Sequence, residues 1–122
     1  MNSFKSVESL FDSGDRIRND AVFQVLLYAC VYGKLNPGTD IEPGLFFIRD
    51  AHSPDFSHAI AMGTKKEKLT SYSKVGAEFE NYLNISLSRL FDFSEPFRQT
   101  ENLQTCRHCP YAPICRRESG NE

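Results

Sequence analysis

The clearest hydrophobic pattern in the chain runs from residue 21 to residue 34, where apolar side chains occupy most positions around a helical turn. Asn19 or Asp20 can cap a helix at the start of this stretch. Its other end contains residues typical of helix termination, which are Gly33, Asn36, Pro37 and Gly38. The pattern therefore predicts an α-helix over residues 21–34 that is enclosed on most sides.

Two polar side chains interrupt this apolar helix. Gln24 and Tyr28 are four residues apart and therefore share one face. Burying an amide or a phenol without a hydrogen-bond partner costs about 1–3 kcal/mol, so an enclosed pair has to face a hydrogen-bonding cleft, water or a charged ligand. The alternative is a solvent-facing stripe on a partly buried helix, and periodicity leaves both open.

Weaker patterns predict the remaining elements. Residues 6–12 favour a short helix, and two apolar runs, residues 44–49 and 57–62, predict strands joined by a loop. Residues 73–91 predict an amphipathic helix whose apolar face carries Val75, Phe79, Tyr82, Leu83, Leu87, Leu90 and Phe91. The tail is rich in proline and cysteine, which favours an irregular loop. Two parts are expected, residues 1–93 and 94–122.

Composition and charge narrow the class of protein. The chain of 122 residues is 40% hydrophobic and 12% aromatic, enough for one modest core. Its 14 basic and 16 acidic side chains give a formal net charge of -2, so any nucleic-acid contact must come from local patches. No signal peptide is recognisable, and no apolar run approaches the length of a membrane span. We therefore expect a soluble, cytoplasmic protein without a membrane partner.

The tail contains a cysteine pattern typical of metal sites. Cys106 and Cys109 form a C-x2-C pair, and Cys115 follows after five residues. Thiolates at this spacing can supply three ligands to one tetrahedral metal or one cubane cluster. The alternatives are a redox pair, a disulfide formed on oxidation, or unliganded thiols. The fourth ligand could be His108, Cys30 or a cysteine outside the chain, although Cys30 lies in the apolar helix and is expected to be an ordinary buried cysteine.

Three further groups of side chains are candidates for binding. One group lies around the predicted strands and consists of His52, His58, Asp50 and Asp55. These side chains could form a metal or acid–base site, or they could be ordinary solvated residues at strand ends. Lysines in one short run, Lys65, Lys66 and Lys68, suit either a phosphate backbone or an ordinary exposed loop. Arginines beside the cysteines, Arg107, Arg116 and Arg117, are the candidate DNA contacts.

The order of these motifs resembles the last part of RecB/AddB-like PD-(D/E)XK nucleases. The resemblance rests on the Gln24-x3-Tyr28 helix, the strands and amphipathic helix after it, Pro96-Phe97, and the three tail cysteines. It implies an α+β fold (or an α/β fragment): a partial restriction-endonuclease-like core in residues 1–93, with a buried Gln-x-x-x-Tyr helix and a short two-strand sheet. Residues 94–122 then correspond to a metal-staple tail.

The resemblance also assigns roles. It implies that Gln24 and Tyr28 assist at the active site without performing the chemistry. It further implies that Cys106, Cys109 and Cys115 are the last three ligands of a [4Fe-4S] cluster whose first cysteine precedes the core. Zinc, or no metal, is the alternative for this chain alone.

The catalytic signature of such nucleases, an acidic residue followed by Asp/Glu-x-Lys, holds Mg²⁺ or Mn²⁺ and activates water. The residues two positions before the lysines are Ser3, Tyr32, Gly63, Thr64, Lys66 and Tyr72, so no lysine completes the signature. By family order it belongs upstream of Met1. We therefore expect a fragment that is inactive by itself.

The expected parent is a DNA exonuclease or helicase-nuclease component of recombination and repair, with DNA and a helicase subunit or domain as partners. Exposed sheet edges also predict self-association of the fragment. The alternative is a non-catalytic zinc-binding module that contacts nucleic acid or protein through a closed site of Cys106, Cys109, Cys115 and His108.

Overall fold

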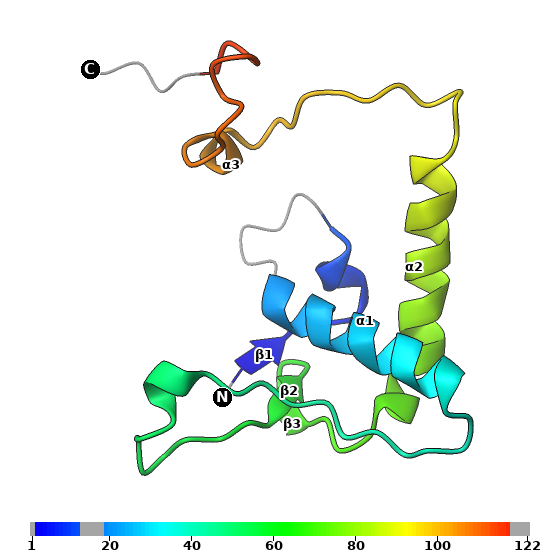
Figure 1. Ribbon diagram of the computed structural model, residues 1–122, viewed down its shortest axis with the longest axis vertical. Helices are drawn as coiled ribbons and strands as arrows, with labels where there is room; N and C mark the ends of the chain where they lie inside the picture. The colour runs from blue at the N-terminus through cyan, green and yellow to red at the C-terminus, as the bar shows by residue number, and fades with distance from the viewer. Residues whose placement is uncertain (1, 13–18, 118–122) are drawn as a thin grey trace. The chain divides into compact units, whose positions relative to one another are not determined.

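The computed structural model describes residues 2–12 and 19–117 and divides the chain into two compact units, residues 1–90 and 91–122 (Figure 1). The first unit contains mixed α and β structure, as the α+β prediction requires. Its elements are β1 (Asn2–Phe4), the 3-10 helix η1 (Glu8–Leu10), α1 (Asp20–Leu35), the 3-10 helix η2 (Ile48–Asp50), β2 (Ile60–Met62), β3 (Glu67–Lys68), the 3-10 helix η3 (Tyr72–Lys74) and α2 (Gly76–Leu90). The second unit contains α3 (Leu103–Cys106).

Helix α1 begins and ends close to the predicted bounds because its capping signals are local. The Asn19 side chain accepts a hydrogen bond from the backbone N–H of Val22, which satisfies one of the unpaired donors of the first turn. Asp20 in the first turn and Lys34 in the last match the helix dipole.

The burial of α1 differs from the prediction of an enclosed helix. Its buried side chains, Val22, Leu26, Ala29 and Cys30, form one face. Gln24 and Tyr28 are exposed, and so are three large apolar side chains near the C-terminal end, Val31, Tyr32 and Leu35. The helix is therefore buried along one face only. Of the two alternatives for Gln24 and Tyr28, the structure shows the solvent-facing stripe.

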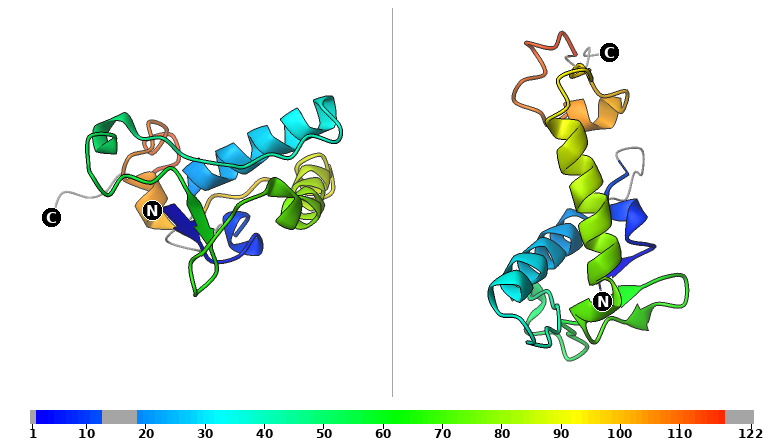
Figure 2. Two further views of the ribbon diagram at one scale, coloured as in Figure 1. Left: turned by 90° about the horizontal axis from the view of Figure 1, so that it is seen from below. Right: turned by 90° about the vertical axis from the view of Figure 1, so that its right-hand side faces the viewer.

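The sheet has three strands in the order β1-β2-β3, where two strands were predicted. β1 pairs with β2 in parallel, with Phe4 opposite Met62, and β2 pairs with β3 antiparallel (Figure 2). The additional strands are β1, whose partner lies more than fifty residues away in sequence, and β3, which has two residues. Local hydrophobic pattern gives no signal for such pairings.

The prediction of a strand over residues 44–49 is wrong. Gly44 forms a single bridge to Ala59, and the chain then turns into η2. The apolar side chains after the bridge, Phe46, Phe47 and Ile48, are exposed. Their hydrophobicity suggests a buried strand, but no strand among the described residues pairs with them, so they do not extend the sheet.

The core of the first unit lies where α1, α2, η1 and the sheet meet. Phe79 of α2 is fully buried, and its ring centroid lies 5.3 Å from that of Phe11 and 5.6 Å from that of Phe23. Phe11 also contacts Phe23 edge-on at 5.2 Å. Aromatic pairs of this kind add to the free energy of area burial. A further link between the two helices is the ion pair of Lys34 with Glu80 at 2.6 Å, and its hydrogen bond and charge raise the pKa of Lys34.

The start of α2 is shaped by a contact between Gly76 and Tyr72. A Cβ atom at Gly76 would lie 2.8 Å from Cε1 of Tyr72, closer than such atoms approach. The Tyr72 ring therefore occupies the space that a side chain at position 76 would need. Burial raises the pKa of the Tyr72 hydroxyl, with the neighbouring Cys30 thiol acting in the same direction.

The second unit is built from turns, with little regular structure. α3 is one short helix, and among the described residues of this unit only Ala112 is buried. In the parts of the chain that the structure describes, no helix is long and apolar enough to cross a membrane.

Replacing Phe79 by alanine should destabilise the first unit by about 3–5 kcal/mol, because the change removes a fully buried ring and leaves a cavity. Urea unfolding followed by circular dichroism measures this loss. The matched control is Leu87→Ala on the same helix, where the side chain is 43% exposed and the expected change is within about 0.5 kcal/mol. Equal effects of the two changes would contradict the assigned core.

Candidate functional site

The two polar residues of α1 form a single hydrogen-bonded unit on its exposed face. Gln24 Nε2 donates a hydrogen bond to Tyr28 Oη over 2.7 Å. Because the Tyr28 oxygen accepts this bond, its O–H can donate away from the helix, and Gln24 Oε1 keeps its capacity to accept. The pair thus presents the Tyr28 O–H as a donor and Gln24 Oε1 as an acceptor, an arrangement that can orient a water molecule or a phosphate oxygen.

Within residues 2–12 and 19–117, no group of three or more His, Cys, Asp or Glu side chains is arranged to hold a metal ion. The chemistry that Gln24 and Tyr28 offer is hydrogen bonding to a bound group.

The three tail cysteines lie along consecutive backbone turns of the second unit. Cys106 ends α3, and its carbonyl accepts from the N–H of Cys109 at 3.2 Å. The Cys109 carbonyl accepts from Ala112 at 3.1 Å, and the Cys115 N–H donates to the Tyr111 carbonyl at 3.1 Å. These bonds bring the cysteines into one small unit.

The turn that carries Cys115 ends in a Schellman-type motif. The N–H of Arg116 donates to the Pro113 carbonyl, and that of Arg117 donates to the Ala112 carbonyl, at 3.1 and 3.0 Å. Arg116 occupies the position usually taken by glycine and has a φ of 55°. Its left-handed conformation costs about 1 kcal/mol relative to glycine.

Arg117 closes the unit through its side chain. Its Nε donates to Gln99 Oε1 at 3.0 Å, and its Nη1 donates to the Thr100 carbonyl. Gln99 Nε2 in turn donates to the Cys115 carbonyl at 3.3 Å. We call Arg117, Gln99 and Thr100 the tail clasp. It fixes the backbone of Cys115 against a segment 16 residues earlier.

Because of the tail clasp, the three arginines predicted as DNA contacts differ in whether their side chains are available. The Arg117 guanidinium is used inside the unit, whereas Arg107 and Arg116 are exposed and form no ion pair with any residue that the structure describes. Gln99 and Thr100 could not be predicted from sequence, because hydrogen bonds between residues so far apart along the chain depend on how the loop folds.

The thiols themselves are free and half-buried at positions 106, 109 and 115. Their donor chemistry suits a soft metal or a cluster, but their positions do not yet form a group that could hold one. Cys30 is a core residue of the first unit, 3% exposed.

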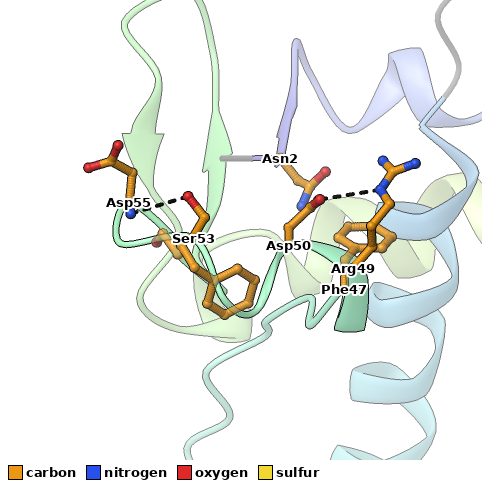
Figure 3. A pocket seen from close by; sticks show the side chains of 8 residues that line it. Asn2, Phe47, Arg49, Asp50, Ser53 and Asp55 are labelled. Atoms are coloured by element: carbon orange, nitrogen blue, oxygen red, sulfur yellow. Dashed lines mark hydrogen bonds and ion pairs between the residues drawn. The ribbon is translucent and has the colours of Figure 1, made fainter.

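The predicted His and Asp cluster is only partly brought together. Asp50 and Asp55 line a pocket of about 330 Å³ between β1 and the loop before β2 (Figure 3), while His52 and His58 do not line it. Arg49 Nε pairs with Asp50 Oδ1 at 3.3 Å inside this pocket. The other lining residues are Asn2, Phe47, Ser53, Phe56 and Ser57. The pocket could not be predicted from sequence, because Asn2 contributes to its lining from β1, which is far from the other lining residues along the chain.

A family model of known proteins matches most of the chain. The family model described as the PD-(D/E)XK nuclease superfamily matches residues 4–116. The chain belongs to the PD-(D/E)XK nuclease superfamily. The match includes the Gln24–Tyr28 face and all three tail cysteines. No curated protein matches the chain, and no solved structure does. Membership in this superfamily indicates a nuclease-type function with nucleic acid as substrate.

Replacing Arg117 by glutamine should loosen the second unit by about 1 kcal/mol, because charge-assisted hydrogen bonds to Gln99 and Thr100 are lost. Amide hydrogen exchange of residues 99–117 should become about fivefold faster. Arg116→Gln is the matched control, since it removes the same charge but no side-chain hydrogen bond among the described residues. Arg116→Gly should slow the exchange by relieving the left-handed backbone. Equal acceleration by Arg116→Gln and Arg117→Gln would refute the clasp.

Proposed function

We propose that this chain forms the C-terminal part of the nuclease domain of a DNA exonuclease or helicase-nuclease that acts in recombination and repair. The observation that carries the proposal is the superfamily match over residues 4–116, which includes both an outward-facing Gln24–Tyr28 pair and a C-x2-C-x5-C tail. A helicase subunit or domain is the proposed partner.

In this function Gln24 and Tyr28 position substrate. The outward O–H of Tyr28 donates to a phosphate oxygen, and Gln24 Oε1 accepts a hydrogen bond from the attacking water. The hydrogen bond between them holds both groups at a fixed spacing on a rigid helix. Removal of either group should therefore weaken catalysis more than folding.

The divalent cation belongs to residues outside this sequence. No lysine of residues 1–122 is preceded two positions earlier by Asp or Glu. Mg²⁺ or Mn²⁺ would supply Lewis acidity and an activated water when bound. In this proposal its carboxylate ligands would come from residues outside 1–122 or from another chain.

The cysteine tail is proposed to fasten this part of the domain to its neighbour. Cys106, Cys109 and Cys115 would supply three thiolates to a [4Fe-4S] cluster, and a cysteine outside residues 1–122 would supply the fourth. Support comes from three free, half-buried thiols carried by one unit and from the clasp that fixes the Cys115 backbone. A zinc ion with His108 as fourth ligand is the other outcome.

The chain alone should not hydrolyse DNA in the presence of Mg²⁺. In an enzyme that also contains the carboxylates, Tyr28→Phe should lower kcat by about tenfold to a hundredfold, because one positioned donor is lost. The control is Tyr32→Phe, which removes an exposed hydroxyl four residues later on the same helix. Hydrolysis rates and thermal unfolding are measured together. Equal rates for Tyr28→Phe and the parent enzyme would refute the proposed role.

Metal content tests the tail separately from activity. Anaerobic reconstitution of the chain with iron and sulfide, or with zinc, should give bound metal that Cys109→Ser reduces by at least half. Cys30→Ala should leave the metal content unchanged, because Cys30 is a buried core residue. Elemental analysis after gel filtration gives the measurement. Metal content that is insensitive to Cys109→Ser would contradict the metal assignment.

A further inference from the structure

The backbone places three lysines, Lys5, Lys65 and Lys66, at one end of the sheet. The parallel register places Phe4 opposite Met62, and the Gly63 N–H donates to the Phe4 carbonyl at 3.0 Å. Lys5 follows Phe4 directly, and the loop over residues 63–66 follows Met62. β1 and β2 point toward the same end of the sheet (Figure 2, left), so Lys5 lies beside the loop that carries Lys65 and Lys66.

The loop between β2 and β3 is a tight turn with an unusual lysine. Gly63 has a φ of 77°, and the Lys66 N–H donates to the Gly63 carbonyl at 3.1 Å. Lys66 has a φ of 53°, a left-handed conformation that glycine or asparagine adopts more readily. The conformation of the turn therefore does not explain why position 66 is a lysine. The positive charge of Lys66 is the property that a function would require.

These lysines differ from others in the first unit by lacking partners. Lys5, Lys65 and Lys66 are exposed and form no ion pair or side-chain hydrogen bond with the residues that the structure describes. By contrast, Lys34 pairs with Glu80 at 2.6 Å and Lys68 with Glu42 at 3.0 Å.

Glu67 follows Lys66 directly, and its side chain forms no ion pair with any residue that the structure describes. Glu67 is paired with Met62 in the antiparallel register, so the two side chains share one face of the sheet. Met62 packs against the hydrophobic core on that face. The positive charge at the sheet end is thus left without a neighbouring carboxylate within hydrogen-bond reach among the described residues.

We propose that the basic sheet end, Lys5, Lys65 and Lys66, contacts the sugar–phosphate backbone of the DNA substrate. The inference rests on the proposed nuclease function and assigns a substrate contact to a surface apart from the Gln24–Tyr28 face. A chain of net charge -2 can attract a polyanion only where unpaired cations gather. Lysine ammonium groups suit phosphates as point charges, and contacts of this kind do not depend on base sequence.

Salt-dependent DNA binding tests the proposal with the full chain. A fluorescein-labelled 20-mer duplex is titrated in EDTA between 50 and 200 mM NaCl, and Kd is read from anisotropy. The triple change Lys5→Gln, Lys65→Gln and Lys66→Gln should weaken binding about tenfold or more. It should also reduce the slope of log affinity against log salt by about 2 to 3, one counterion for each lost phosphate contact.

A matched variant removes the same charge from other lysines. Lys34→Gln, Lys68→Gln and Lys74→Gln together should leave affinity and slope nearly unchanged, because Lys34 and Lys68 already have carboxylate partners and Lys74 donates to Thr70 Oγ1 at 2.8 Å. Equal losses in the two triple variants would mean bulk electrostatics and would overturn the proposal. Absence of DNA binding by the unaltered chain would overturn it as well.

A single substitution separates binding from folding. Lys66→Gly should raise Tm, since it relieves a left-handed residue, and should still weaken DNA binding by severalfold. Unchanged affinity in this variant would argue against a role for Lys66. The binding measurements need no hydrolysis and are independent of the Tyr28→Phe experiment. Loss of binding in the lysine variants with a normal kcat in Tyr28→Phe would support the basic sheet end and reject the helix-face role. Normal binding in the lysine variants with a lowered kcat in Tyr28→Phe would reject the basic sheet end and support the helix-face role.

Discussion

Burial of Phe79 against Phe11 and Phe23 is the contact on which the first unit depends. The three rings come from α2, from the residue after η1 and from α1, so one aromatic cluster joins segments that are far apart in sequence. The orientation of α1 follows from it. With Val22 and Leu26 turned toward this core, Gln24 and Tyr28 necessarily lie on the opposite, exposed face.

The second unit is held by a different kind of interaction. It buries almost no apolar side chain among its described residues, and hydrogen bonds of turns and of the tail clasp organise it. Such a unit gains little from the hydrophobic effect, so a bound metal or cluster would contribute a large share of its stability. The proposed staple and the observed lack of a core are therefore consistent with each other.

Sequence information was sufficient where the determinants are local. The ends of α1 follow from Asn19 and the glycine and asparagine residues after it, and the Gln24–Tyr28 spacing fixed their shared face. The pairing of β1 with β2 was not predictable, because Asn2 and Ser3 have no strand-like pattern and their partners lie far along the chain. The run Phe46–Ile48 was misleading because hydrophobicity is a local property, whereas a strand also requires a neighbouring strand to pair with.

The contact between Gly76 and the Tyr72 ring limits which substitutions position 76 can accept. Because the ring fills the space that a Cβ at position 76 would need, a side chain at 76 requires the ring to shift or a smaller residue at position 72. A residue larger than glycine at 76 should therefore be best accommodated together with a residue smaller than tyrosine at 72. One steric contact thus couples the two positions, although the residues belong to different helices.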